Sequence, residues 1–400
     1  MTLACSTADV RVTLSVPSMT VQVFLIILSC GVVGTLGAAV PLTMLSDPSA
    51  KCLDGTQAGY YAQFASNPAD SNKWVIYLNG GGECDSKDAC VSQTTNSLGS
   101  SKYFYPTYDA SSWFLGSDYC TNNPDFCGWN HAFDPYCTQD LHAGQRTEAT
   151  DDTWGLYFSG HHVFKATLDA LDKSTNSLKD ATDIILQGVS AGGIGVWMNL
   201  DYLAHRYPKA RVTGVTIAGH YFYATYYNGT DHTNPGGMAD FRESAFPSTY
   251  TLYDAFVDQT CKKAYEHKGE SAGACMLSNN SFPFIESDSF VIQAQTDQVV
   301  LTGHDCWPEN HMYEPEEQTF MNEWHNNMTV ALAPLMKSDN PRNGVFAAAC
   351  YTHTGFSSTK PLIQGLSYSQ AFHNFYFNTT SPDQFKLSDD CGLMCNPTCM

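Results

Sequence analysis

The chain has 400 residues, with 20 basic against 40 acidic side chains and a formal net charge of −20. Hydrophobic residues make up 43% and aromatic residues 13%, which is enough for a sizeable core and excludes a disordered chain. The acidic balance excludes general nucleic-acid binding and disfavours strongly acidic polymers, unless the binding cleft carries a different local charge.

The N-terminal segment has the features of an export signal. Residues 21–40 form an uncharged apolar run, and Gly37 and Ala39 stand where a signal peptidase requires small residues. We predict that residues 1–39 are a cleaved signal peptide. The alternative is an uncleaved signal anchor of a type II membrane protein, because the run is just long enough to span a bilayer. No second run of that length follows, so residues 40–400 are predicted to form a single catalytic domain without membrane contact of its own.

Cysteines and glycosylation motifs support export. Removing Cys5 and Cys30 with the leader leaves an odd number of cysteines, so one thiol is free or pairs between chains. Spacing in the Cys-rich tail, residues 381–400, lacks a matching histidine pair, so we predict no metal site. Disulfides are expected within three local clusters: Cys84 with Cys90; Cys120, Cys127 and Cys137; and Cys391, Cys395 and Cys399. The candidate glycosylation sites are Asn228, Asn279, Asn327 and Asn378.

Short apolar runs alternate with helical patterns along the chain. Residues 84–150 are predicted to be a long disulfide-held loop region with a strand near 132–136. Strands alternating with helices predict a parallel sheet with helices on both faces. The predicted strands are Lys73–Asn79, Asp183–Leu186, Arg211–Ala218, Ser289–Ala294 and Val345–Tyr351, and the predicted helices lie within 153–178, 194–205 and 320–336.

Residues Gly188-Val189-Ser190-Ala191-Gly192 match the nucleophile elbow, G-x-S-x-G. The glycines leave room for a tight turn between strand and helix that lifts the serine hydroxyl above the sheet edge. The short pattern also occurs by chance, and the alternative is an ordinary glycine turn at a helix N-terminus. The strand before it and the helix after it favour a catalytic serine.

A serine nucleophile requires a base and a carboxylate that orients the base. In α/β-hydrolases they follow in the order serine, acid, histidine, each just after a later strand. Asp297 follows the run FVIQA by three residues, and His353 follows FAAACY by two, so both meet this requirement. The rival residues are the carboxylates Asp305 and Glu309 and the histidines His304, His311 and His373.

An oxyanion hole requires backbone N–H donors aimed at the oxygen that becomes negative. Ala191 supplies one, and the glycine loop Gly80–Gly82 after an early strand is the expected source of others. A flexible hairpin or a phosphate loop is the alternative. Neither G-x-G-x-x-G nor G-x-x-x-x-G-K-[ST] is present, which disfavours a Rossmann or P-loop protein.

Six ordered segments resemble the pectin acetylesterase/Notum family of secreted serine carboxylesterases over roughly residues 45–380. The resemblance implies an α/β-hydrolase fold with a mostly parallel central sheet flanked by helices. It further implies Ser190 as nucleophile, Asp297 as orienting acid and His353 as base, with Gly81, Gly82 and Ala191 in the oxyanion hole and no cofactor. The segments are Tyr77–Cys84, Trp129–Gly144, Leu156–Leu171, Gly188–Leu203, Phe290–Leu301 and Ala349–His353.

The resemblance also suggests two classes of substrate. Plant members of the family remove acetyl groups from pectin, and the animal branch removes a fatty acyl group from a signalling protein. We therefore expect a secreted O-deacetylase of cell-wall or extracellular polysaccharide, such as acetylated pectin. The alternative is a Notum-like O-deacylase that removes a longer acyl group from a protein or lipid. Lesser alternatives are a serine peptidase and a non-catalytic binding protein on the same fold.

Two departures from the family bear on the acyl group. Asn79 stands where the family usually has glutamate, and Gly82-Glu83 replaces an aromatic residue that walls the acyl pocket. A carboxylate beside the oxyanion loop disfavours a long apolar chain, so we predict faster turnover of acetyl and butyryl esters. The alternative is that Glu83 faces solvent. Residues 221–240 match neither branch and are expected to be a lid, a saccharide platform or a glycosylated loop.

Overall fold

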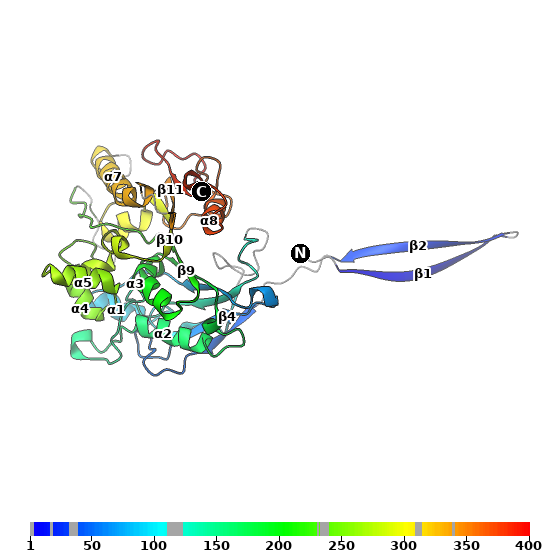
Figure 1. Ribbon diagram of the computed structural model, residues 1–400, viewed down its shortest axis with the longest axis horizontal. Helices are drawn as coiled ribbons and strands as arrows, with labels where there is room; N and C mark the ends of the chain where they lie inside the picture. The colour runs from blue at the N-terminus through cyan, green and yellow to red at the C-terminus, as the bar shows by residue number, and fades with distance from the viewer. Residues whose placement is uncertain are drawn as a thin grey trace. The chain divides into compact units, whose positions relative to one another are not determined.

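The computed structural model divides the chain into two compact units, Met1–Ala39 and Val40–Met400. In the first, β1 (Ala4–Val16) pairs antiparallel with β2 (Met19–Gly31) (Figure 1). The apolar run begins within β2, and its role as signal peptide or anchor stays a prediction. Among the described residues, no helix is long and apolar enough to cross a membrane. The structure describes residues 4–16, 19–31, 39–109, 123–229, 232, 240–308, 314–337 and 341–400, the first two ranges as backbone only.

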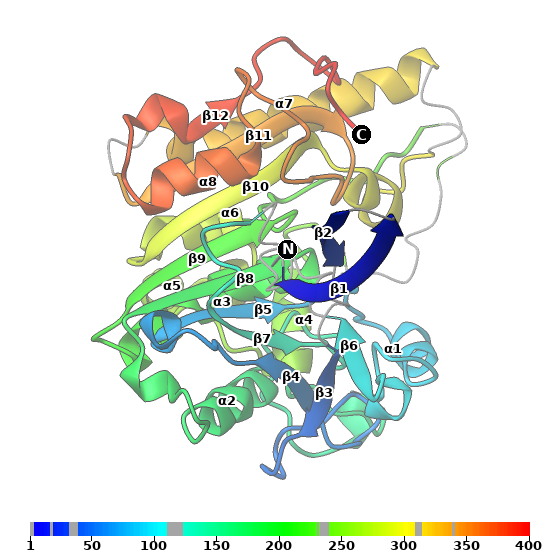
Figure 2. The ribbon, with the colours of Figure 1, turned by 90° about the vertical axis from the view of Figure 1, so that its right-hand side faces the viewer.

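The second unit is built on a ten-stranded sheet in the order β12-β11-β10-β9-β8-β5-β7-β4-β3-β6 (Figure 2). Neighbouring strands from β12 to β7 are parallel, whereas β4 and β3 continue the sheet antiparallel. The predicted mostly parallel sheet is therefore confirmed. The strands are β3 (Ala39–Met44), β4 (Gly59–Gln63), β5 (Lys73–Leu78), β6 (Thr107–Asp109), β7 (Asn130–Asp134), β8 (Asp183–Val189), β9 (Arg211–Ile217), β10 (Asp288–Thr296), β11 (Asn343–Tyr351) and β12 (Lys386–Ser388).

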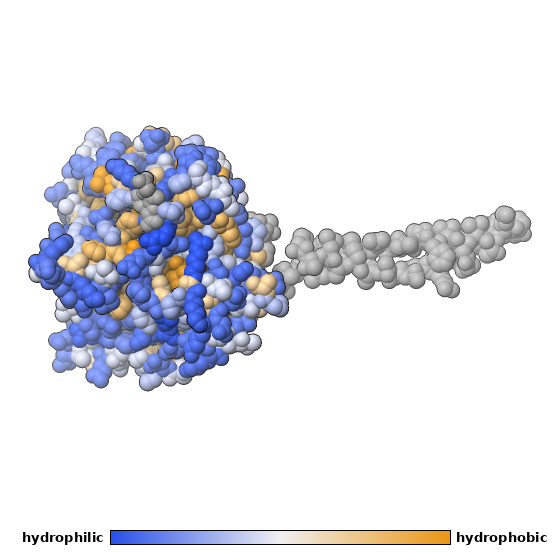
Figure 3. Space-filling view, in the orientation of Figure 1, coloured by the Kyte–Doolittle hydropathy of each residue, from blue (hydrophilic) through white to orange (hydrophobic). Residues whose placement is uncertain are grey.

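Helices cover both faces of this sheet. Successive side chains of a strand point to opposite faces. Trp74 and Ile76 accordingly pack with α2 and α3, whereas Val75 between them belongs to the cluster that contains Phe372 of α8. The face of this unit turned to the viewer in Figure 3 is mostly hydrophilic, with apolar residues gathered near its middle. The helices are α1 (Lys87–Gln93), α2 (Gly160–Leu171), α3 (Ala191–Arg206), α4 (Phe246–Tyr253), α5 (Gln259–His267), α6 (Ser278–Ser281), α7 (Pro315–Lys337) and α8 (Tyr368–Tyr376).

The largest departures from the sequence expectations lie between residues 84 and 160. The region predicted as a loop contains α1 as well as β7, and β7 ends at Asp134 instead of residue 136. Tyr136 has a φ of 55°, which a strand cannot continue through. The predicted helix within 153–178 begins only at Gly160, because Trp154 adopts a left-handed backbone and Phe158 forms an antiparallel bridge with Arg146.

Disulfides tie the loops of the second unit to its sheet. The local pair Cys84–Cys90 is confirmed. Two cysteines predicted to bond within their local clusters form long-range disulfides instead. Cys137 bonds Cys52, and Cys399 bonds Cys350 at the end of β11. The remaining described bonds are Cys261–Cys275 and Cys391–Cys395; Cys127 is also disulfide-bonded, Cys120 lies outside the described residues, and Cys306 is a buried free thiol.

Peptide mapping without reduction will test this arrangement. We expect the long-range pairs Cys52–Cys137 and Cys350–Cys399, and we expect Cys306 to be alkylated only after unfolding, because its side chain is buried. Rapid alkylation of Cys306 in the native protein, or its recovery in a disulfide, would contradict the structure.

Candidate active site

Ser190 occupies a strained turn between β8 and α3. Its backbone has φ 56° and ψ −125°, a region that residues with a Cβ adopt only when their surroundings hold them there. A Cβ at Gly188 would lie 2.1 Å from the carbonyl oxygen of Gly192, and one at Gly192 would lie 2.1 Å from that of Leu78. The glycines are therefore required by backbone-to-backbone contact, as the sequence pattern predicts.

Asp297 and His353 meet beside this turn. Asp297 directly follows β10, and His353 follows β11 by one intervening residue. Because β10 and β11 are parallel neighbours, both side chains lie at the same sheet edge. The Nδ1 atom of His353 lies 2.9 Å from each carboxylate oxygen of Asp297. Nδ1 therefore donates to the carboxylate, which leaves Nε2 to accept a proton.

The carboxylate of Asp297 is fully buried and fixed from several sides. The backbone N–H groups of Val299 and Val300 donate to Oδ1 at 3.0 and 3.1 Å, and the Tyr221 hydroxyl lies 3.0 Å from Oδ2. These contacts hold the acid in the orientation that His353 uses. No sequence pattern indicates Tyr221 as a partner of Asp297, beyond its place in the tyrosine-rich stretch 221–240.

The pair sets the basicity of the imidazole. Burial lowers the pKa of His353, but the negative charge of Asp297 and its hydrogen bond outweigh burial, and the pKa of His353 is raised. The imidazolium that forms when His353 takes a proton is thus stabilised by its neighbour.

The glycine loop after β5 lies against the serine turn. A Cβ at Gly80 would come within 2.5 Å of the Val189 carbonyl oxygen, and Gly81 and Gly82 both have positive φ. Within the described residues, the N–H groups of Gly81, Gly82 and Ala191 donate to no acceptor. Amides left without a protein acceptor beside Ser190 are what an oxyanion hole requires.

The carbonyl oxygens of the same loop are held from behind. Gly82 accepts from the Tyr136 hydroxyl at 2.8 Å, and Gly81 accepts from the Gln139 side-chain amide at 3.1 Å. The ring of His142 donates from Nε2 to the Asn79 carbonyl at 2.9 Å. Burial lowers the pKa of His142 to about 4, so this ring is neutral at physiological pH. These three bonds fix the orientation of the peptide groups that face Ser190.

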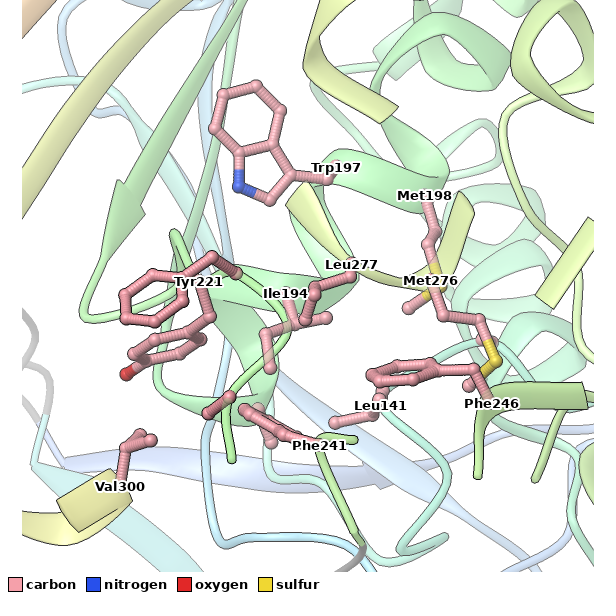
Figure 4. Close-up of a cluster of buried hydrophobic side chains, with 14 of the residues drawn as sticks. Leu141, Ile194, Trp197, Met198, Tyr221, Phe241, Phe246, Met276, Leu277 and Val300 are labelled. Atoms are coloured by element: carbon pink, nitrogen blue, oxygen red, sulfur yellow. The ribbon is translucent and has the colours of Figure 1, made fainter. Parts of the chain in front are cut away.

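Two hollows share Ser190, Gly82, Val299 and His353. One, called the closed cavity below because it is more enclosed than the other, has a volume of about 30 Å³. Its apolar walls include Ile194, Tyr221, Phe241 and Val300, and Figure 4 shows these four within one hydrophobic cluster. The other is an open groove of about 500 Å³. The cavity has room for only two or three water-sized groups, since one water needs roughly 10–15 Å³.

Glu83 forms part of the cavity wall. It is 4% exposed, so the alternative that it faces solvent is wrong. Its Oε1 lies 3.6 Å from Nδ1 of His304, whose ring packs on Phe241 with centroids 4.1 Å apart. The expected carboxylate beside the oxyanion loop is present, but it lies against a histidine rather than standing alone.

The other rival residues have different neighbours. Asp305 accepts from Trp324 Nε1 at 2.7 Å, and burial raises its pKa well above the ordinary range. His373 lies 2.8 Å from Asp125. The remaining rivals, Glu309 and His311, lie outside the described residues.

The stretch 221–240 contributes core at its start. Tyr221, Phe222, Ala224 and Tyr227 are buried, so this part is neither a lid nor a surface platform. The rest lies mostly outside the described residues. Asn228, Asn279, Asn327 and Asn378 are all exposed, and their glycosylation stays a prediction. The described residues contain no group of three or more His, Cys, Asp or Glu side chains that could hold a metal ion.

Comparisons with known proteins agree with this architecture. The sequence model of the Pectinacetylesterase family matches residues 34–400. Pectin acetylesterase 5 of Arabidopsis thaliana is 26% identical over 89% of this chain and 83% of its own length. Palmitoleoyl-protein carboxylesterase notum1' of Xenopus laevis is 27% identical over 90% of this chain and 74% of its own length. The solved structure of the Wnt deacylase Notum from Drosophila superposes with a TM-score of 0.76 at 23% identity, covering 91% of this chain and 100% of that one, which confirms the α/β-hydrolase fold.

The pH dependence of hydrolysis will test the His353–Asp297 pair. We expect kcat/KM for an aryl ester to fall at low pH with a midpoint above the ordinary histidine value of about 6.5, because Asp297 raises the pKa of His353 and only neutral His353 accepts a proton. Asp297→Asn removes that charge, so the midpoint should move to lower pH while kcat falls by about 10⁴.

His373→Gln is the matched control, because His373 also pairs with an aspartate, Asp125. It should leave both the midpoint and the rate unchanged. A midpoint that stays in place in Asp297→Asn would show that another group limits the reaction at low pH.

Proposed function

Because the chain belongs to the pectinacetylesterase family, we propose that Ser190, His353 and Asp297 are the catalytic triad of an esterase that removes acetyl groups from extracellular saccharide. The family supports ester hydrolysis in general. The observation that carries the finer proposal is the small closed cavity beside Ser190, since its volume of about 30 Å³ suits a very short acyl group.

The proposed reaction is a two-step acyl transfer. His353 Nε2 takes the proton of Ser190 as the Oγ atom attacks the ester carbonyl. The imidazolium is stabilised by Asp297, and the N–H groups of Gly81, Gly82 and Ala191 stabilise the oxyanion. His353 then protonates the leaving alcohol, and water activated by His353 releases the acid and restores Ser190.

The two hollows suggest how the ester is oriented. The acyl group would enter the closed cavity, whose wall contains Phe241 and the Glu83–His304 pair. The alcohol would lie in the open groove, where a larger saccharide has room. A fatty acyl group would need a pocket on the order of several hundred Å³, as drug-sized ligands do. The closed cavity therefore favours acetyl over the longer groups that a Notum-like deacylase removes.

Disulfide content supports the extracellular part of the proposal. Bonds such as Cys52–Cys137 persist in oxidising compartments, and the apolar leader is the candidate export signal. We therefore propose a secreted enzyme, acting in the extracellular space or cell wall unless residues 1–39 are retained as an anchor.

Ser190→Ala tests the nucleophile directly. We expect kcat for aryl acetates to fall by about a millionfold, because the triad acts as a unit. The thermal unfolding midpoint should stay close to that of the wild type, since alanine fits the same turn. Ser92→Ala, which removes an exposed hydroxyl on α1, should leave hydrolysis unchanged. Activity within tenfold of wild type in Ser190→Ala would reject Ser190 as nucleophile.

A series of aryl esters with increasing acyl length tests the cavity. We expect kcat/KM to be higher for acetyl and butyryl than for octanoyl, because the cavity is closed and small. Phe241→Ala should enlarge the cavity and move the optimum to longer chains, whereas Phe246→Ala should not, because Phe246 packs on Phe241 outside the cavity. Both variants should lose roughly 3–5 kcal/mol of stability.

Glu83→Gln separates charge from volume. If the carboxylate excludes long chains, this variant should gain activity on octanoyl esters without a larger cavity. If volume alone decides, it should retain the wild-type preference. A wild-type optimum at eight carbons or more would reject the acetyl proposal and favour the fatty-acyl alternative.

A further inference from the structure

Among the described residues that line the open groove beside Ser190, His353 is the only one whose side chain can carry a positive charge. Tyr77, Asn79, Val189, Val299 and Thr354 form its walls around the glycine loop, and none of the residues that line it is lysine or arginine. The closed cavity likewise lacks lysine and arginine. Each segment of the chain outside the described ranges also lacks both residues, so none of them can bring such a charge to the groove.

The fixed charges close to the site are mainly carboxylates. Glu83 lines the cavity, and Asp297 lies behind the imidazole. Arg242, next to the cavity residue Phe241 in sequence, is bound by both oxygens of Asp240, with its Nε 2.8 Å from Oδ2 and 3.0 Å from Oδ1. An anion in the groove would therefore meet no guanidinium among the described lining residues, and the chain as a whole carries a formal net charge of −20.

We propose, on the basis of the function proposed above, that the saccharide accepted by this groove is uncharged at the acetylated ring. A uronate has a carboxylate on the same ring as its acetyl esters. Binding it would place that carboxylate in a groove whose described lining residues include no lysine or arginine to supply a counter-charge. The net negative charge would also slow its approach. Acetylated neutral polysaccharide is therefore the proposed substrate class, in place of acetylated polyuronates such as the pectin expected from the family resemblance.

The groove offers a neutral sugar a suitable surface. The Tyr77 ring stacks on Phe133 with centroids 5.2 Å apart, and Phe133 stacks on Tyr108 at 4.7 Å. Tyr77 lines the groove, and an aromatic ring offers an apolar surface against which the C–H face of a pyranose can pack. Asn79 and Thr354 add uncharged hydrogen-bonding groups for hydroxyls.

The test compares two sugars acetylated at the same two hydroxyl groups, methyl galactoside and methyl galacturonoside. They differ only at C6, where the second has a carboxylate in place of CH2OH. Acetate release is measured at about 0.01 M and about 1 M NaCl, where the Debye length is roughly 30 Å and 3 Å. At low salt we expect kcat/KM for the neutral sugar to be higher by about tenfold or more, and we expect salt to narrow the difference. Equal rates at low salt, or a preference for the uronate, would overturn the proposal.

Thr354→Lys provides a second test, because Thr354 is exposed on the groove wall. It should raise the ratio of uronate to neutral kcat/KM several-fold, and Thr354→Met, of similar length but uncharged, should not. An unchanged ratio in Thr354→Lys would overturn the proposal. If neither sugar is cleaved while an aryl acetate still is, the saccharide inference fails and the esterase stands. If wild-type enzyme cleaves no aryl acetate, the proposed function itself fails.

Discussion

The site depends on the close backbone contact between the serine turn and its neighbours. Ser190 is held at a positive φ because Gly188, Gly192 and Gly80 allow peptide groups to approach where any Cβ would collide. This contact brings the end of β8, the start of α3 and the loop after β5 together. The proposed nucleophile and the candidate oxyanion amides are therefore placed by one packing arrangement, and a side chain at any of the three glycines would disturb both.

Behind that contact lies a second strained segment. Tyr136, Gln139, Leu141 and His142 all have left-handed backbone conformations, which cost free energy in residues other than glycine. Side chains of three of them hold the carbonyl oxygens of the glycine loop. The Cys52–Cys137 bond fixes the start of the segment, and the buried Asp140 accepts from Thr138 Oγ1 at 2.6 Å and from the Gly160 N–H at 2.8 Å. The glycine loop Gly80–Gly82 has a flexible sequence. The hydrogen bonds from the segment 136–142 hold its peptide groups, so its N–H groups keep one orientation.

Two hollows of different volume adjoin Ser190. On the proposed acyl side, the Glu83–His304 pair and the Phe241 ring leave a cavity of about 30 Å³. On the proposed alcohol side, a groove of about 500 Å³, with no lysine or arginine among its described lining residues, is bounded by Tyr77. We expect the cavity to limit the length of the acyl group and the groove to select the charge of the alcohol. Different residues would then control each property.

The sequence alone determined the parallel strands at the centre of the sheet, the helices α2, α3 and α7, and the glycine turn at Ser190, but not the outer strands β3, β4, β6 and β12. It also located Asp297 and His353, because each follows an apolar strand directly, and strand ends are marked by local pattern. Only the tertiary structure decided that Tyr221 contacts Asp297, that Glu83 is buried against His304, and that Cys137 and Cys399 bond cysteines 85 and 49 residues away. Hydrophobic periodicity describes one segment at a time. These contacts join loops that meet only after the parallel strands have brought their carboxyl ends to one edge of the sheet.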